Sequence, residues 1–160
     1  MTRKDIFKQI RIFDGLDEGQ MNQVRACCQE VEFKAGSRVF ADGQQAENLF
    51  VVLEGRVDLR FEIPGRESTS SDNITSVRQG QVLGWSALMH SPIYSLSAYC
   101  ATDGCRLLKV SRDCLLDKFE KDPRMGYIVM SHLAEVIRTR FHQVQEELAR
   151  KKGIPAARHC

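Results

Sequence analysis

The hydrophobic pattern of this chain changes its period twice, and this change most limits the folds that the chain can adopt. The first thirty residues show helical spacing, and Asp17 with Gln20 is placed as a capping box before a helix. From residue 31 apolar positions alternate, and short apolar runs are separated by turns. Helical spacing returns after Asp122 and Pro123, a typical helix start. Short strands without interleaved helices predict an antiparallel β-structure between two helical segments.

We therefore predict a mainly β fold with flanking α-helices. Its core is an antiparallel β-roll or jelly-roll barrel, preceded by short N-terminal helices and followed by a long C-terminal helix. The predicted parts are N-terminal helices over residues 1–29, the roll over 30–118, the long helix over 122–150 and a flexible basic tail over 151–160. Within the roll, residues 31–33, 39–40, 49–53, 56–61, 74–77, 96–100 and 107–110 are expected to form strands.

The charge and hydropathy of the chain exclude several classes of function. Lysine and arginine number 23 and aspartate and glutamate 21, a net charge of +2, which argues against a dedicated binder of nucleic acid or anionic membranes. No apolar run approaches the roughly 20 residues that span a bilayer. No long apolar segment follows the start of the chain. We therefore expect no membrane association, no secretory signal and a cytoplasmic location.

The cysteines and histidines give no sign of a metal centre or a catalytic set. The six cysteines include no C-x-x-C spacing, and without an export signal we expect buried or free thiols rather than disulfides. The histidines are scattered and form no H-x-H pair: His90, His132, His142 and His159. No P-loop, dinucleotide fingerprint or nucleophile elbow is present. We predict that the chain is not an enzyme, binds no metal and requires no cofactor.

The predicted long helix carries two apolar stripes. One stripe follows the 4-3-4-3-4 spacing of a heptad seam and consists of Met130, Ala134, Ile137, Phe141, Val144 and Leu148. The other consists of Val129, Leu133 and Val136. We predict that one stripe packs on the roll and that the seam packs on a second copy, which makes the protein a homodimer. The alternative is one wide stripe that faces the core of a single chain.

Residues 80–98 are the most informative segment. This segment contains Leu83-Gly84-Trp85-Ser86-Ala87-Leu88, and no charged residue occurs between Arg78 and Asp103. Two helices, strands with glycines at matching turns, this segment and a long closing helix follow one another in a fixed order. Over about residues 6–148 this order resembles the cyclic nucleotide-binding domain, the sensor part of regulators of the catabolite activator protein type and of kinase regulatory subunits. The resemblance rests on Gly36, Phe40, residues 49–55, Gly80 and Gly84.

In that family the segment is a phosphate-binding cassette of the form Phe-Gly-Glu-x-Ala-Leu, followed after a short loop by Arg and a small residue. The resemblance implies that a short helix begins at Gly84, that the Glu holds the ribose hydroxyl and that the Arg holds the phosphate. Here Trp85 stands at the position of the Glu and Tyr94 at that of the Arg. The ligand-binding residues that the resemblance implies are Leu83, Gly84, Trp85, Ser86, Ala87, Leu88, Tyr94 and Ser95.

The two replacements remove the ionic contacts to the family's ligand. Each such contact contributes roughly 1.5–3 kcal/mol, so the affinity for a cyclic nucleotide falls about 10²–10⁴-fold if nothing compensates. Arg60, Arg138 and Arg140 are other cations of the same domain, but nothing in their spacing requires them at this site. We predict a pocket of the family's kind that does not bind cyclic AMP in the usual way.

Two functions agree with this pattern. In the first, the chain is a regulatory sensor of an unidentified small ligand, and occupancy of the cassette repositions the long helix toward a partner protein. In the second, Trp85 plugs the pocket and the domain is a ligand-free interaction scaffold. Because only about ten residues follow the long helix, we expect no helix-turn-helix and no DNA binding. The tail, with Arg150, Lys151, Lys152 and Arg158 and no acidic residue, is expected to be solvated.

Overall fold

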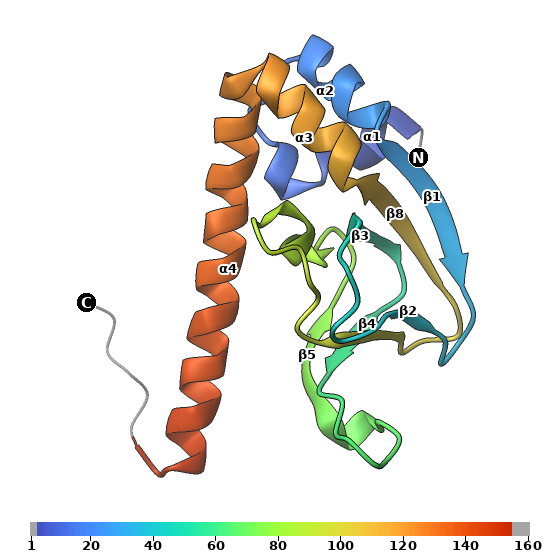
Figure 1. Cartoon of the computed structure of the whole chain (residues 1–160), viewed down its shortest axis with the longest axis vertical. Coiled ribbons are helices and arrows are strands. Elements are labelled where there is room, and N and C mark those ends of the chain that lie inside the picture. Colours follow the sequence, from blue (N-terminus) through green and yellow to red (C-terminus); the bar gives the residue numbers. More distant parts are fainter. Residues whose placement is uncertain (1–2, 155–160) are drawn as a thin grey trace.

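The N-terminal segment forms three short helices that cover one end of the molecule (Figure 1). The computed structural model describes residues 3–154, and of residues 3–5 the backbone alone. The helices are α1 (Arg3–Lys8), the 3-10 helix η1 (Arg11–Phe13) and α2 (Glu18–Arg25). The predicted capping box is confirmed, because Asp17 accepts from the Gln20 backbone at 2.8 Å and Gln20 accepts from the Asp17 backbone at 3.0 Å.

Two four-stranded antiparallel sheets form the roll, which confirms the predicted fold class. The first sheet has the order β1 (Cys28–Phe33), β8 (Cys105–Ser111), β3 (Asn48–Glu54) and β6 (Val82–Leu83). The second has the order β2 (Arg38–Phe40), β7 (Ser97–Cys100), β4 (Val57–Arg60) and β5 (Asn73–Val77). The 3-10 helices η2 (Ser70–Asp72) and η3 (Trp85–Leu88) lie in the connections that flank β5 and β6.

Strand β3 lies between two hydrophobic clusters. Its residues Leu49, Val51 and Leu53 belong to the cluster that the helices cover. Phe50 and Val52 belong to the cluster between the two sheets. All five side chains are buried, as expected for an apolar strand that is covered on both faces. One face of β3 therefore packs on the helices, and its other face packs on the second sheet.

Two helices follow the roll, where the sequence predicted one. The roll was expected to reach residue 118, but β8 ends at Ser111 and α3 (Arg112–Lys121) begins there, with the Ser111 hydroxyl accepting from the Cys114 backbone at 3.3 Å. This helix is short, and among its residues only Leu115 is fully buried, so its apolar pattern is weak. Helix α4 (Pro123–Lys151) begins as predicted, with Asp122 as its capping residue.

The two predicted stripes of α4 have different surroundings. Val129 and Leu133 are fully buried against the helical cluster, and Val136 packs at its edge. The heptad seam is divided: its early members Met130 and Ile137 also pack on this cluster, and Ala134 is exposed. Its late members Phe141, Val144 and Leu148 are 62%, 50% and 53% exposed. In Figure 1 the C-terminal half of α4 runs beside the roll and ends at about the level of the loop before β5.

Four cysteines form disulfides, so the prediction that they are free or buried thiols is wrong. Cys27, just after α2, pairs with Cys114 in the first turn of α3 across 87 residues of sequence. Cys100 and Cys105 close the turn between β7 and β8. The sequence could not show these pairs, because one joins distant segments and the other has no recognised spacing. Cys28 is the free cysteine of the described residues, and burial raises its pKa to about 12.

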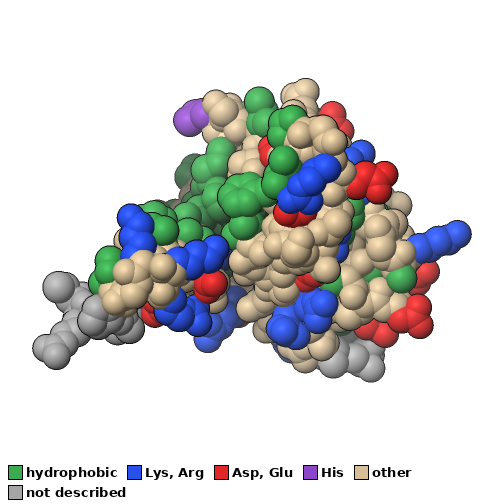
Figure 2. Space-filling view, turned by 90° about the horizontal axis from the view of Figure 1, so that it is seen from below, with side chains coloured by type: hydrophobic (Ala, Val, Ile, Leu, Met, Phe, Trp, Pro, Cys, Tyr) green, Lys and Arg blue, Asp and Glu red, His purple; other side chains and the backbone are tan. Residues whose placement is uncertain are grey.

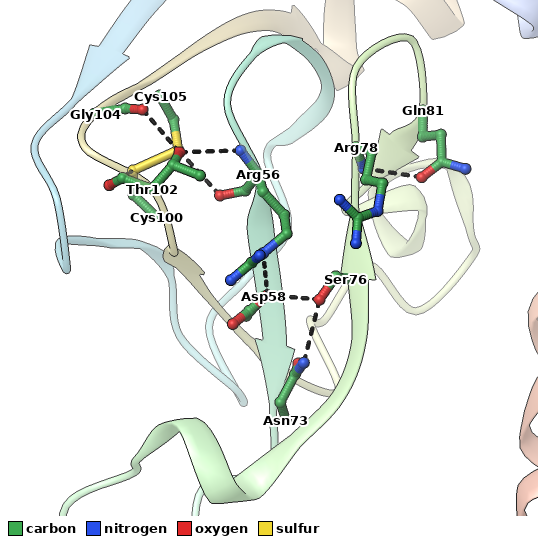
Figure 3. A network of polar contacts seen from close by, with 10 residues as sticks. All are labelled: Arg56, Asp58, Asn73, Ser76, Arg78, Gln81, Cys100, Thr102, Gly104 and Cys105. Atoms are coloured by element: carbon green, nitrogen blue, oxygen red, sulfur yellow. Dashed lines mark hydrogen bonds and ion pairs between the residues drawn. A yellow bond between two sulfur atoms is a disulfide. The ribbon is translucent and has the colours of Figure 1, made fainter.

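A polar network on the outer face of β4 is structural (Figure 3). The carboxylate of Asp58, which is 4% exposed, accepts from the Ser76 hydroxyl at 2.7 Å and pairs with the Arg56 guanidinium at 3.3 Å. Nearby, the Thr102 hydroxyl accepts from the Arg56 backbone at 3.1 Å. These contacts tie β4 to β5 and to the disulfide-closed turn, and they satisfy the buried carboxylate.

Among the residues that the structure describes, no helix has both the length and the hydropathy to cross a membrane. The described residues also contain no group of three or more His, Cys, Asp or Glu side chains placed to hold a metal ion. Of the predicted basic tail, only residues 151–154 lie within the described part of the chain. His159, Arg158 and Cys160 lie outside it.

Candidate functional site

The segment around Gly84 forms the turn and short helix that the resemblance implies. Gly84 has a left-handed backbone with φ +73°, and η3 follows it immediately. A Cβ at this position would lie 3.2 Å from the Asn48 carbonyl oxygen and 3.2 Å from Cε1 of Tyr94. Both the conformation and the close approach therefore require glycine.

Tyr94, which the resemblance places at the position of the family's arginine, is a packed, neutral phenol. Its side chain is 3% exposed, and its ring stacks on Phe40 with centroids 3.8 Å apart. The hydroxyl donates to the Asn48 carbonyl oxygen at 2.5 Å. Burial raises the pKa of Tyr94 to about 12, so the phenol carries no charge at neutral pH. Because the stacked rings are buried, a charged side chain at this position would lose its contact with water.

A cavity of about 750 Å³ lies between the cassette, the roll and α4. Its walls include Gly84, Trp85, Ser86, Tyr94 and Ser95 of the cassette. The roll adds Phe40, Leu59, Phe61, Asn73, Ile74, Thr75 and Leu96, and α4 adds Ile137, Arg140, Phe141, Gln143, Val144, Glu146, Glu147, Leu148, Arg150 and Lys151. Figure 2 shows hydrophobic side chains gathered between the end of α4 and the roll.

The eight predicted ligand-binding residues divide into two sets. Five of them line the cavity: Gly84, Trp85, Ser86, Tyr94 and Ser95. Leu83, Ala87 and Leu88 are buried in the two hydrophobic clusters and do not line it. Trp85 is half-buried, packs against the helical cluster and borders the cavity. The cavity thus persists beside the indole.

Two arginines from the C-terminal helices contact the cassette backbone. Arg112, the first residue of α3, donates to the carbonyl oxygens of Ala87 and, at 3.1 Å, of Met89. Arg140 of α4 donates to the carbonyl oxygen of Val82, just before the cassette turn. The sequence shows a cassette without charged residues and no spacing that requires Arg140 there, and the structure places Arg140 at the cassette backbone. Arg112 was missed because nothing in its local sequence indicates which distant carbonyls it reaches.

The other two arginines that the sequence suggested lie elsewhere. Arg138 is exposed on α4 and pairs with Glu135 of the same helix at 3.3 Å. Arg60 lies over the Tyr99 ring, 4.5 Å from its centroid. Neither lines the cavity, so among the suggested arginines Arg140 alone reaches the site in the described part of the chain.

Replacement of Arg112 by glutamine is expected to lower the free energy of unfolding by about 1.5–3 kcal/mol, the contribution of hydrogen bonds from a charged donor. The variant leaves the carbonyls of Ala87 and Met89 without this guanidinium. Urea unfolding measures the change. The matched control is Arg78→Gln, an exposed arginine near the start of the cassette segment, for which a change within about 0.5 kcal/mol is expected. Equal effects of the two substitutions would contradict a structural role for Arg112.

Comparison with known proteins agrees with this geometry. The family model described as cyclic nucleotide-binding domain matches residues 30–122. The CRP-like cAMP-activated global transcriptional regulator of Mycobacterium tuberculosis is 24% identical over 135 residues, 84% of this chain and 58% of the relative. The chain thus spans a little over half the length of this curated relative.

Solved structures show the same fold. A presumed cyclic nucleotide-binding protein from Geobacter metallireducens superposes with a TM-score of 0.75 and 27% identity over 89% of this chain and 100% of its own. A cyclic nucleotide-binding domain from Methylobacillus flagellatus gives a TM-score of 0.76 at 19% identity, covering 92% of this chain and 80% of that one. The family match extends over more than half of the chain and includes both sheets and the cassette turn. The chain therefore belongs to the cyclic nucleotide-binding domain family.

Proposed function

We propose that this protein is a regulatory sensor of a small ligand, which binds in the cavity between the cassette and α4. The observation that carries the proposal is that α4 itself forms one wall of this cavity. A ligand in the cavity therefore contacts both the cassette and the helix, and it favours whichever helix position gives the better contacts. The ligand is not a cyclic nucleotide held in the family's usual way, because Trp85 and Tyr94 replace the two charged residues of the cassette.

Two contacts support transmission through the C-terminal helices. Arg112 ties the end of η3 to the start of α3, and Arg140 ties the start of the cassette to α4. A shift of the cassette on ligand binding would move the carbonyl oxygens to which both arginines donate. Side-chain contacts with two alternative arrangements are the usual carriers of such coupling.

Homodimer formation through α4 is part of this proposal. Phe141, Val144 and Leu148 repeat at seam spacing on the exposed half of the helix, and large apolar side chains at this spacing are typical of helix-to-helix contacts. The same residues border the cavity, so a second copy would close its rim. An output to a partner protein would then depend on the relative position of the two helices.

The alternative, a ligand-free scaffold plugged by Trp85, is favoured less. The indole is half-buried against the helical cluster, and a cavity within the usual size range of ligand sites, about 300–1,000 Å³, remains beside it. A plugged site would leave no such space.

Native mass spectrometry of the freshly purified protein tests the proposal. The expected result is a dimer that carries a small molecule, which is released at higher collision energy. Hydrogen exchange of α4 is then compared before and after the small molecule is removed. Its C-terminal half, residues 136–151, is expected to exchange at least about tenfold faster without the ligand. Identical exchange of α4 in the two states would contradict transmission through the helix.

A further inference from the structure

We propose that the ligand of this cavity is an apolar molecule with one anionic group, and that Arg140 binds this group. The inference rests on the proposed function, because it names the ligand class of the same site. It follows from three properties of the cavity: its apolar walls, the state of the Arg140 guanidinium and the positions of the remaining charges.

Apolar side chains from the roll, the cassette and α4 line much of the cavity. Leu59, Phe61 and Ile74 of these residues come from the roll. Trp85 comes from the cassette, and Ile137 comes from α4. Phe61 and Ile74 are 53% and 39% exposed, so they offer apolar surface that the protein itself does not cover. Burying such surface against an apolar ligand contributes about 25 cal/mol for each Å² removed from water.

Arg140 is a cation with unused hydrogen-bonding capacity at this wall. Its guanidinium has five N–H donors, and one hydrogen bond, to the Val82 carbonyl, is present among the described residues. None of the ion pairs within the described part of the chain includes this residue. Burial lowers the pKa of Arg140 to about 10, which reflects the loss of water around its charge. An anion that binds there replaces the missing hydration.

The other charged groups of the cavity lie toward the C-terminal end of α4. Arg150 pairs with Glu147 at 2.7 Å, so their charges compensate each other. Glu146 and Lys151 carry opposite charges on the last turns of the same helix. Arg140 lies two to three turns earlier, contacts Val82 at the start of the cassette and lines the cavity, and no ion pair among the described residues compensates its charge.

The ligand class can be tested with three ten-carbon probes that differ in their head group. The probes are decanoate, 1-decanol and decyltrimethylammonium, and the signal is the fluorescence of Trp85, the one tryptophan of the chain, which borders the cavity. Decanoate is expected to bind saturably and at least about tenfold more tightly than decanol, because a charge-assisted hydrogen bond contributes more than one decade of affinity. The cationic probe is expected to bind no better than decanol.

Substitution of Arg140 locates the anionic group. Arg140→Gln is expected to weaken decanoate binding about 10- to 100-fold and to leave decanol binding unchanged. Arg138→Gln is the matched control, because this arginine lies on the same helix, is exposed and does not line the cavity. It is expected to leave both affinities unchanged. If Arg140→Gln does not fold, the three probes on the unmodified protein still decide between anionic and uncharged ligands.

The inference is overturned if decanol or the cationic probe binds as tightly as decanoate, if no probe binds, or if Arg140→Gln keeps the decanoate affinity of the unmodified protein. These results would leave the proposed sensor function standing. That function fails instead when decanoate binds but the hydrogen exchange of α4 does not change. The two failures are therefore distinguishable in the same samples.

Discussion

Calorimetric titration with cyclic AMP and cyclic GMP is expected to show no submicromolar binding. The resemblance places Trp85 and Tyr94 where the family's cassette has Glu and Arg, and the absence of both contacts is expected to weaken binding about 10²–10⁴-fold if nothing compensates. The structure adds a steric reason. The ring of Tyr94 is buried, stacks on Phe40 and lies against Gly84, where the resemblance places the cyclic phosphate. Arg140 lines the cavity from α4 and contacts the Val82 carbonyl, and it does not stand at the position of Tyr94.

The double variant Trp85→Glu with Tyr94→Arg is expected to recover this loss and to bind cyclic AMP about 10²–10⁴-fold more tightly than the unmodified protein. Trp85 borders the cavity, so a carboxylate there has access to a ribose hydroxyl. Tyr127→Arg is the control for added positive charge, because Tyr127 is 76% exposed on α4, and it is expected to change nothing.

Submicromolar binding of either nucleotide by the unmodified protein, stripped of co-purified ligand, would refute the prediction. A double variant that is destabilised and still does not bind would favour the scaffold with a filled site. Both results come from one set of titrations and one unfolding curve for each variant.

Removal of the disulfide between Cys27 and Cys114 is expected to lower the free energy of unfolding by about 4–5 kcal/mol. The bond spans 87 residues of sequence, and a cross-link across so long a loop restricts the unfolded chain strongly. It also ties the end of α2 to the first turn of α3, so its loss removes the covalent link between the helices that precede and follow the roll. The double variant Cys27→Ala with Cys114→Ala, compared with the unmodified oxidised protein in urea, measures the change.

The second disulfide is an internal control for this loop-length argument. Cys100 and Cys105 are five residues apart, so the double alanine variant of this pair is expected to lose only about 2 kcal/mol. Cys28→Ala, which removes a free thiol, is expected to cost about 1 kcal/mol. Equal losses for the two disulfide variants would show that restriction of the unfolded chain is not the source of the stability.

The local signals in the sequence were sufficient for most of the fold. The capping box of Asp17 and Gln20, the helix start at Asp122 and the two-sided burial of residues 49–53 each depend on neighbours within a few positions. Helix α3 was missed because its apolar residues Cys114, Leu115, Leu116 and Phe119 directly follow a strand and are too few to show a helical period.

The sequence was sufficient to predict where the cassette lies, but not which charged side chains contact it. The order of glycines and apolar runs located the cassette, because those positions are fixed by backbone conformation and packing. The contacts of Arg112 and Arg140, and the disulfide of Cys27, join segments that are distant in sequence. Such contacts depend on how the elements pack in three dimensions, which a local pattern does not encode. The same reason explains why the sequence did not show that the first half of the α4 seam packs on the helical cluster while its second half is exposed. This difference depends on where the roll lies.

The position of β3 between the two clusters limits how the molecule can change during evolution. A strand with one face in water can exchange half of its side chains freely, whereas every apolar residue of β3 from Leu49 to Leu53 has neighbours on its own side. Substitutions at successive positions therefore affect opposite layers in turn. Surface positions of α4 such as Phe141 and Leu148, which are more than half exposed, are freer to vary than this strand.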